Sequence, residues 1–214
     1  MESARADQRR EAGLRTRTRL LDAVLDLLAR RGEDGVTLRE VTNAADANIA
    51  AVSYHFGSLQ SLCDAGIEHA LERYLDAQQE AVGTLGPESD LEALAEAFAR
   101  PMIGALAAGG RDLGVMRIVA RVGIDPPPAW DRLSGRFDRI RADVLRVLKA
   151  NLPEVKEREL DFRTRCAAGT LNWLILAPVG AELRSKSPKQ IERLVVPVLA
   201  GGFRGTSPTI QAPA

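Results

Sequence analysis

The chain is short of the side chains that bind metals or carry out nucleophilic catalysis. It has only two cysteines, Cys63 and Cys166, and two histidines, His55 and His69, in 214 residues. The cysteines are far apart and neither belongs to a CxxC pair, so we expect reduced, buried thiols and no disulfide or zinc site. No Ser-His-Asp set, HExxH motif, P-loop or paired-carboxylate signature is present. The sequence therefore predicts no catalytic residue, metal or cofactor, and no enzyme.

Long apolar runs are also missing. The longest extends from Trp173 to Ala181 and stops at Glu182, about half of the roughly 18 residues needed to cross a bilayer. The N-terminal residues lack the apolar stretch of a signal peptide. We therefore expect a cytoplasmic protein with no membrane partner.

Neither sign of charge is in excess, because 29 basic residues balance 29 acidic ones. This balance argues against a protein that coats nucleic acid non-specifically. The first twenty residues are an exception, with six arginines and three acidic residues. Residues 1–13 are predicted to form a flexible basic arm, which either contacts DNA phosphates or enters a minor groove, or is simply a solvated tail.

Helical spacing of apolar residues runs through almost every long segment, and no segment alternates like a strand. Breaks at 83–87, 109–110, 125–128 and 153 divide the pattern into about nine helices. Long helices are predicted from Ser58 to about Ala81, from Ala129 to Asn151, and from Val155 to Leu183. Capping boxes are predicted at 89–92 and 187–190. The predicted fold class is all-α.

The stretch from Thr37 to Leu59 has the most specific pattern. Thr37 and Glu40 form a predicted capping box for one short helix, and Asn48 is the predicted cap of a second. The second helix carries small, uncharged side chains on its outer face, so it is slim enough to enter a DNA major groove. Two helices this short need a third to pack against. The apolar stripe that predicts it lies upstream and consists of Leu21, Val24, Leu25 and Leu28.

The residues Val52-Ser53-Tyr54-His55-Phe56-Gly57-Ser58 close this stretch, and here the chain resembles the DNA-binding domain of TetR-type transcriptional regulators. The resemblance is specific over residues 14–65. It implies a three-helix helix-turn-helix domain followed by a larger helical domain that binds ligand and dimerises. The implied boundaries are a basic arm at 1–13, the DNA-binding domain at 14–60, the regulatory and dimerisation domain at 61–203, and a disordered tail at 204–214.

Candidate DNA contacts fall into two groups. Side chains that read bases stand at the exposed N-terminal part of the inserted helix, where apolar groups suit thymine methyls and a serine discriminates weakly. These are Asn48, Ile49, Ala50, Ala51 and Ser53. The resemblance implies phosphate contacts from Thr37, Arg39, Tyr54 and His55, and the backbone amides at Ser58 can also hold a phosphate.

Some of these residues also admit a purely structural role. Thr37 caps a helix whether or not it contacts DNA, Tyr54 could belong to the core, and His55 could be a half-buried histidine. The family usually places a lysine at the start of the fourth helix, where this chain has Leu59. The missing cation predicts weaker and less salt-dependent DNA binding.

The resemblance implies a pocket for a small effector in the C-terminal domain, of unknown identity and apolar or amphipathic character. Apolar stripes at helical spacing are equally consistent with plain core, and that alternative remains open for each residue. Nine aromatic residues in the whole chain predict a mostly aliphatic lining. The candidate lining residues are Phe98, Met102, Leu106, Met116, Val119, Phe137, Ile140, Arg141, Cys166, Asn172 and Trp173.

A homodimer follows from the size of the DNA-reading helix, because one helix reads too few base pairs for specificity. The last two long helices are the expected interface, packed as a four-helix bundle across a two-fold axis. The candidate interface residues are Ala167, Ala168, Gly169, Leu171, Leu174, Leu194 and Val198, and packing within one subunit is the alternative.

The function predicted from the sequence is a DNA-binding transcriptional regulator, specifically a repressor that binds a double-stranded operator as a dimer and is released by an effector. The alternative is a helical ligand carrier or adaptor that does not bind DNA. An activator, or a regulator without a ligand, is also compatible with the residues.

Overall fold

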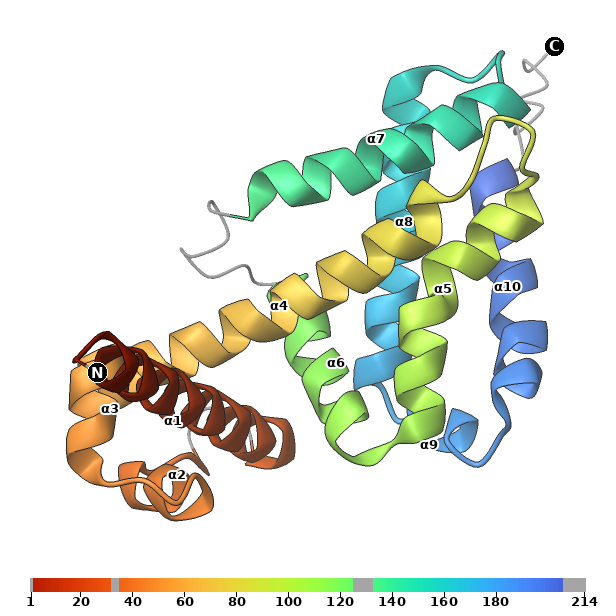
Figure 1. The fold of residues 1–214 in the computed structure, drawn as a ribbon. Helices are drawn as coiled ribbons and strands as arrows, with labels where there is room; N and C mark the ends of the chain where they lie inside the picture. The colour runs from red at the N-terminus through yellow and green to blue at the C-terminus, as the bar shows by residue number, and fades with distance from the viewer. Residues whose placement is uncertain (1, 32–34, 125–132, 206–214) are drawn as a thin grey trace, which may run out of the picture. The chain divides into compact units, whose positions relative to one another are not determined.

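The computed structural model describes residues 2–31, 35–124 and 133–205, which form ten α-helices and no strand (Figure 1). The all-α prediction is confirmed. The described residues divide into two compact units, one within 1–74 and 108–132 and the other within 75–107 and 133–214. None of the helices in these ranges is both long and apolar enough to cross a membrane. The prolines at 126–128 and residues 206–214 lie outside the described residues, whereas Arg204, predicted to open the disordered tail, is helical.

The first unit contains α1 (Glu2–Arg31), α2 (Leu38–Ala44), α3 (Ile49–Phe56), α6 (Gly110–Val122) and most of α4 (Leu59–Gly83). The predicted apolar stripe of α1 is buried, with Val24 and Leu25 essentially inaccessible to solvent. Val41 of α2 and Val52 of α3 are buried as well, and α1 packs against both helices. The three-helix platform predicted from the sequence is therefore present.

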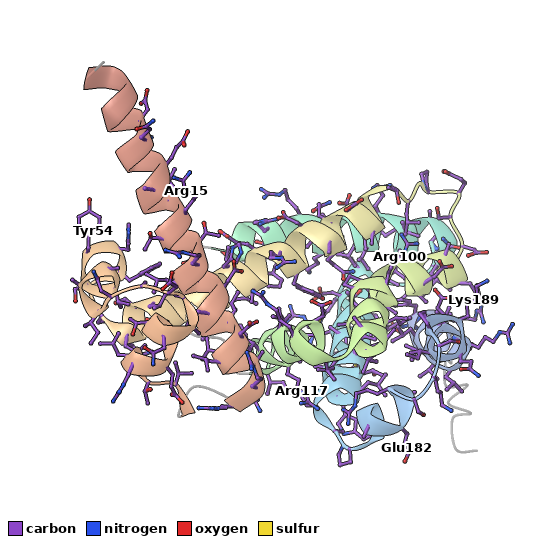
Figure 2. All side chains as sticks on the ribbon, turned by 60° about the horizontal axis from the view of Figure 1, so that its bottom comes forward. Arg15, Tyr54, Arg100, Arg117, Glu182 and Lys189 are labelled. Carbon is purple, nitrogen blue, oxygen red and sulfur yellow. The ribbon has the colours of Figure 1, made fainter. Side chains whose placement is uncertain are left out.

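The N-terminal segment differs from the prediction. α1 begins at Glu2, so residues 2–13, predicted as a flexible arm, are helical, and Figure 2 shows this end of α1 continuing past the neighbouring helices of its unit. The segment lacks proline and is rich in alanine, arginine and glutamate, which are strong helix formers. Its helical character was missed because it has no apolar stripe.

Helix α6 packs closely on α1 at two adjacent points. Arg111 pairs with Asp22 at 2.7 Å and with Asp26 at 2.8 Å. One turn further on, Gly114 lies so close to α1 that a Cβ atom placed on it would be 2.8 Å from the carbonyl oxygen of Ala29. The absence of a side chain at Gly114 therefore permits this approach.

The second unit contains the rest of α4 together with α5 (Leu91–Ala108), α7 (Ser134–Asn151), α8 (Glu157–Leu176), α9 (Val179–Leu183) and α10 (Pro188–Arg204). Helix α8 packs against α7 on one side and α10 on the other (Figure 1). Leu94, Leu148, Leu160 and Phe203 are fully buried. The rings of Phe98 and Phe203 meet edge to face at 5.9 Å.

Helix ends account for the other differences from the sequence prediction. Asp90 caps α5 by accepting from the Ala93 amide at 2.7 Å, whereas the Ser89 hydroxyl accepts from Gly86. The long helix predicted to reach Leu183 ends at Leu176, because Pro178 follows and proline has no N–H to donate. This break makes ten helices where about nine were predicted. The capping box at Ser187 and Gln190 is confirmed.

A buried arginine holds the end of α10. The guanidinium of Arg163 on α8 donates to the Phe203 carbonyl at 2.9 Å and also to the Arg204 carbonyl, and it pairs with Glu159. Carbonyls in the last turn of a helix have no partner within the helix. Arg163 supplies the missing donors, and these acceptors stabilise its buried charge.

We expect Gly114→Ala to destabilise the protein by about 1–3 kcal/mol, because the added methyl group overlaps Ala29 and must push α6 away from α1. Gly104→Ala is the control. Gly104 lies inside α5 with open space around it, so alanine there should stabilise by about 0.5–1 kcal/mol through helix propensity. Urea unfolding of both variants measures the difference. Equal effects of the two substitutions would contradict the close packing of α6 on α1.

Candidate nucleic-acid interface

Helix α3 is short and is fixed at both ends. The Asn48 side chain accepts from the Ala51 amide at 2.8 Å, which confirms the predicted cap. At the other end Gly57 adopts a φ of 81°, and its N–H bonds to the carbonyls of Val52 and Ser53. A positive φ suits glycine because it has no Cβ. Val52 is the buried anchor of the helix, so the opposite side of α3 faces outward.

The outward side of α3 presents the predicted base-reading residues. Ile49 is 55% exposed and Tyr54 is 83% exposed, and Ala50 and Ser53 are also on the surface. Figure 2 shows the Tyr54 side chain pointing away from the ribbon. Of the two residues with a possible core role, Tyr54 is therefore a surface residue and His55 is half-buried. An exposed tyrosine without a burial role is available for contact with a partner.

The remaining predicted DNA contacts are also accessible. Thr37, Arg39, Asn48 and Ser58 are exposed, and Ala51 is half-buried. Asn48, Ala50, Ala51, Tyr54 and His55 line one open groove of about 490 Å³. The structure thus brings five of the ten predicted residues together in a single concave surface.

Other residues of this groove are not among the ten predicted DNA contacts. Its other walls are Thr16 and Arg19 from α1 and Asp46 and Ala47 from the turn before α3. Arg19 approaches Asp46 at 3.5 Å. The only sequence signal for the turn was its position just before the Asn48 cap.

Asp46 shapes the turn between α2 and α3. Its φ is 46°, which is the left-handed region that asparagine and aspartate tolerate better than other non-glycine residues. The next residue, Ala47, donates its N–H to the Thr42 carbonyl at 2.9 Å. This turn sets the direction in which α3 leaves α2, and therefore where its outer face points.

Helix α1 also lies beside the C-terminal end of α3. A Cβ atom on Gly13 would lie 3.8 Å from the His55 ring, and the Arg17 guanidinium lies 5.1 Å from the centre of the Phe56 ring. The latter distance is within the range of a cation–π contact. The basic part of α1 therefore lies beside the candidate interface and adds positive charge to it.

Thr37, Glu40 and Arg31 join the start of α2 to the end of α1. The Thr37 hydroxyl accepts from the Glu40 amide and donates to the Glu40 carboxylate at 2.7 Å, and Arg31 pairs with the same carboxylate at 2.5 Å. Thr37 therefore caps α2 as predicted, and the Glu40 side chain bonds back to Thr37 within a network that also includes α1. The hydrogen bonds from Thr37 and Arg31 hold the pKa of Glu40 below its usual value.

The predicted effector-pocket residues belong to both units. Phe98, Met102, Leu106 and Ile140 are buried in the second unit, with Phe137 and Asn172 half-buried there. Met116 and Val119 lie on α6 in the first unit. These placements agree with the plain-core alternative as well as with a lining role.

Three pocket candidates require correction. Cys166 and Trp173 are exposed on α8, so the expectation of buried thiols holds for Cys63 alone. Arg141 is on the surface and pairs with Asp161, because its long charged side chain finds a carboxylate on neighbouring α8 and not an apolar pocket.

The predicted dimer residues divide in a similar way. Ala167 and Leu171 are buried on the side of α8 that faces the core, and Ala168 and Leu174 are half-buried. Gly169, Leu194 and Val198 are on the surface. Large exposed apolar side chains cluster on the outer faces of α8 and α10. They are Phe162, Trp173, Leu194 and Val198, each 50–63% exposed. Phe162 was not among the predicted residues.

Two family models match successive parts of the chain. A family model described as bacterial regulatory proteins of the tetR family matches residues 20–65, and one described as a tetracyclin repressor-like C-terminal domain matches residues 96–202. An uncharacterised HTH-type transcriptional regulator from the dhlA 5′ region of Xanthobacter autotrophicus is 34% identical over 86 residues. That match covers 40% of this chain and 42% of the relative's length.

Solved structures of similar fold extend over nearly the whole chain. A transcriptional regulator from Rhodococcus sp. RHA1 aligns with a TM-score of 0.61 at 22% identity, covering 87% of this chain and 95% of that one. The multidrug binding protein EbrR, solved with malachite green, aligns with a TM-score of 0.56 at 20% identity, covering 87% and 96%. At these identities the similarity concerns the fold.

The Glu40 network predicts a pH-dependent contribution to stability. Because folding lowers the pKa of Glu40, the contribution is fully present above the unfolded value and is lost as pH falls through the folded value. We expect Glu40→Gln to lower the unfolding temperature at pH 7, and we expect the difference from the unsubstituted protein to shrink at about pH 3. Thermal unfolding at both pH values tests this, and an equal difference at both would contradict it.

Proposed function

The chain belongs to the TetR family of bacterial transcriptional regulators, and we propose that it is an effector-responsive repressor that binds a two-fold operator as a homodimer. The observation that best supports this proposal is the outer face of α3, which is capped at both ends and carries exposed Ile49, Ser53 and Tyr54. A carrier that used these helices only for packing would have no reason to leave a tyrosine 83% exposed. We propose residues 14–60 as the DNA-binding domain and 61–203 as the regulatory and dimerisation domain.

The chemistry of α3 predicts how the operator is recognised. Ile49, Ala50 and Ala51 offer methyl and methylene surface that suits thymine, and Ser53 accepts or donates to several base edges. No arginine, glutamine or glutamate lies on this face to make a bidentate base contact. Affinity then depends more on phosphate contacts from Thr37, Arg39, Tyr54 and His55, with the amides at Ser58, and on DNA shape.

We propose that the outer faces of α8 and α10 form the dimer interface. Exposed apolar side chains from two neighbouring helices make a patch that water solvates poorly, and a second copy related by a two-fold axis would cover it with the same residues. Cys166, Gly169 and Trp173 share the outer face of α8 with Phe162. Pairing of two copies lets two α3 helices reach successive major grooves about 34–36 Å apart.

An effector bound in the second unit would act by favouring a conformation that releases DNA. The similar fold of EbrR, a multidrug binding protein solved with malachite green, supports a binding role for this domain. The proposed lining comes from Phe98, Met102, Leu106, Phe137, Ile140 and Asn172. Most of these residues are packed in the core. An effector can therefore bind among them only if the helices of the second unit move apart.

The function is tested by titrating labelled duplexes from the region upstream of the protein's own gene with the full chain and following fluorescence anisotropy. We expect one duplex to bind at least about 10³-fold more tightly than scrambled DNA of the same composition. Equal affinity for all duplexes at physiological salt would contradict a sequence-specific regulator.

We expect Tyr54→Ala to weaken operator binding by about tenfold or more, because each protomer loses one phosphate contact. The unfolding temperature should stay within about 2 °C of the unsubstituted value, because the side chain is already in solvent. Arg39→Met is the matched comparison. It removes a charge, so it should also reduce the salt slope by about one unit per protomer, whereas Tyr54→Ala leaves the slope unchanged. An unaltered affinity for Tyr54→Ala would remove Tyr54 from the interface.

We expect Val198→Glu to yield a monomer at micromolar concentration, because two buried carboxylates would face each other near the two-fold axis. Operator affinity should fall by about 100-fold or more. Ala150→Glu, on the exposed side of α7, is the control and should leave both properties unchanged. Native mass spectrometry measures the oligomeric state, and a dimeric Val198→Glu variant would place the interface elsewhere.

A further inference from the structure

A glutamine lies inside the apolar core of the second unit. Leu75, Gln78 and Val82 form the buried stripe of the C-terminal part of α4, and Gln78 is only 2% exposed. Its amide Nε2 donates to the Phe98 carbonyl on α5 at 3.3 Å. Its Oε1 atom has no hydrogen-bond partner among the described residues. A buried acceptor without a donor lowers stability unless something binds it.

The backbone carbonyl of Phe98 determines which end of the Gln78 side-chain amide is unpaired. A backbone carbonyl can only accept, so the Nε2 end of Gln78 must face it and the Oε1 end must point elsewhere. Rotating the amide by half a turn would place two acceptors against each other. The unpaired group is therefore an acceptor.

A second acceptor, which lacks its regular helix partner, belongs to the residue next to Phe98 in the chain. Pro101 is inside α5 and has no N–H, so the carbonyl of Ala97 receives no hydrogen bond from the residue four positions later. Ala97 is itself 1% exposed, so this carbonyl belongs to a solvent-excluded part of the helix. This carbonyl belongs to the residue that precedes Phe98, the hydrogen-bond partner of Gln78.

The surroundings of these acceptors are apolar and offer no free charge. Leu94, Phe98 and Phe203 are buried close by in the core of this unit. Among the described residues of this unit, the buried arginine is Arg163. Its guanidinium is already bound to the end of α10 and to Glu159. A charged group placed here would lose its hydration without gaining a counter-ion.

We infer that the Gln78 Oε1 atom and the Ala97 carbonyl form the polar end of the effector site, and that the effector is a neutral, largely aliphatic molecule with one hydroxyl or N–H donor. This inference depends on the proposed effector response. An ionised carboxylate is excluded because it only accepts hydrogen bonds and would face two acceptors. The bound donor would satisfy the Gln78 acceptor that the free protein leaves unpaired, so binding would favour the arrangement of α4 and α5 that exposes it.

The test compares three probes of matched length: 1-decanol, nonyl methyl ether and decanoate. The alcohol and the ether have the same number of heavy atoms, but only the alcohol donates a hydrogen bond. We expect 1-decanol to raise the unfolding temperature of the full chain and to release operator at a concentration at least tenfold lower than the ether. Decanoate should bind more weakly than either. Equal potency of alcohol and ether, or no response to any probe, would overturn the inference.

Gln78→Met removes the side-chain acceptor while keeping the length of the chain. We expect this variant to be as stable as the unsubstituted protein or more so, with unchanged operator affinity and no preference for the alcohol over the ether. Gln79→Met is the control, since Gln79 donates to Asp143 and lies outside the stripe, so the tenfold preference should remain. A retained preference in Gln78→Met would overturn the assignment.

Pro101→Ala tests the second acceptor. Alanine supplies the N–H that the Ala97 carbonyl lacks, so the variant should unfold at a higher temperature and show a reduced alcohol preference. An undiminished preference would remove Ala97 from the site. Operator binding without probes is measured for every variant. Intact operator binding without alcohol preference would refute this inference alone, whereas loss of sequence-specific binding in the unsubstituted protein would refute the proposed function.

Discussion

The exposed face of α3 depends on the burial of Val52 where this helix packs against α1 and α2. The helix has eight residues, too few to be stable alone in water, and Val52 is its buried anchor. The Asn48 cap and the Gly57 turn satisfy its ends, so the exposed side chains of Ile49, Ala50, Ser53 and Tyr54 are not needed to hold the helix. A helix held by one anchor and two caps can vary its outer residues freely, and this freedom suits a surface that reads DNA.

The first unit is larger than a helix-turn-helix alone, because α6 packs on α1 through Arg111 and Gly114. Helix α6 is connected to α5 through Gly109, and α4 passes from one compact unit into the other. The chain therefore crosses between the units more than once. Helix α5 of the second unit is thus joined through a single residue to α6, the helix that packs on α1.

The sequence predicted those features that depend on local chemistry. The caps at Asn48 and Ser187, the apolar stripe of α1 and the exposure of α3 follow from residue type and spacing, and the structure has them. Features that depend on distant partners were not predictable. Arg141 and Arg163 look alike in the sequence, yet one lies on the surface and the other is buried because only the second meets free helix carbonyls. Periodicity likewise placed Ala167 and Leu171 on a helix but could not tell which face of it meets the core.

The hydrogen bonds from Arg163 to the end of α10 limit how far the chain can be shortened from its C-terminus. Its guanidinium is bound by the carbonyls of Phe203 and Arg204, so a truncation before these residues would leave a desolvated cation with Glu159 as its remaining partner. The same truncation removes the ring that packs against Phe98. A shortened expression form must therefore retain the last turn of α10.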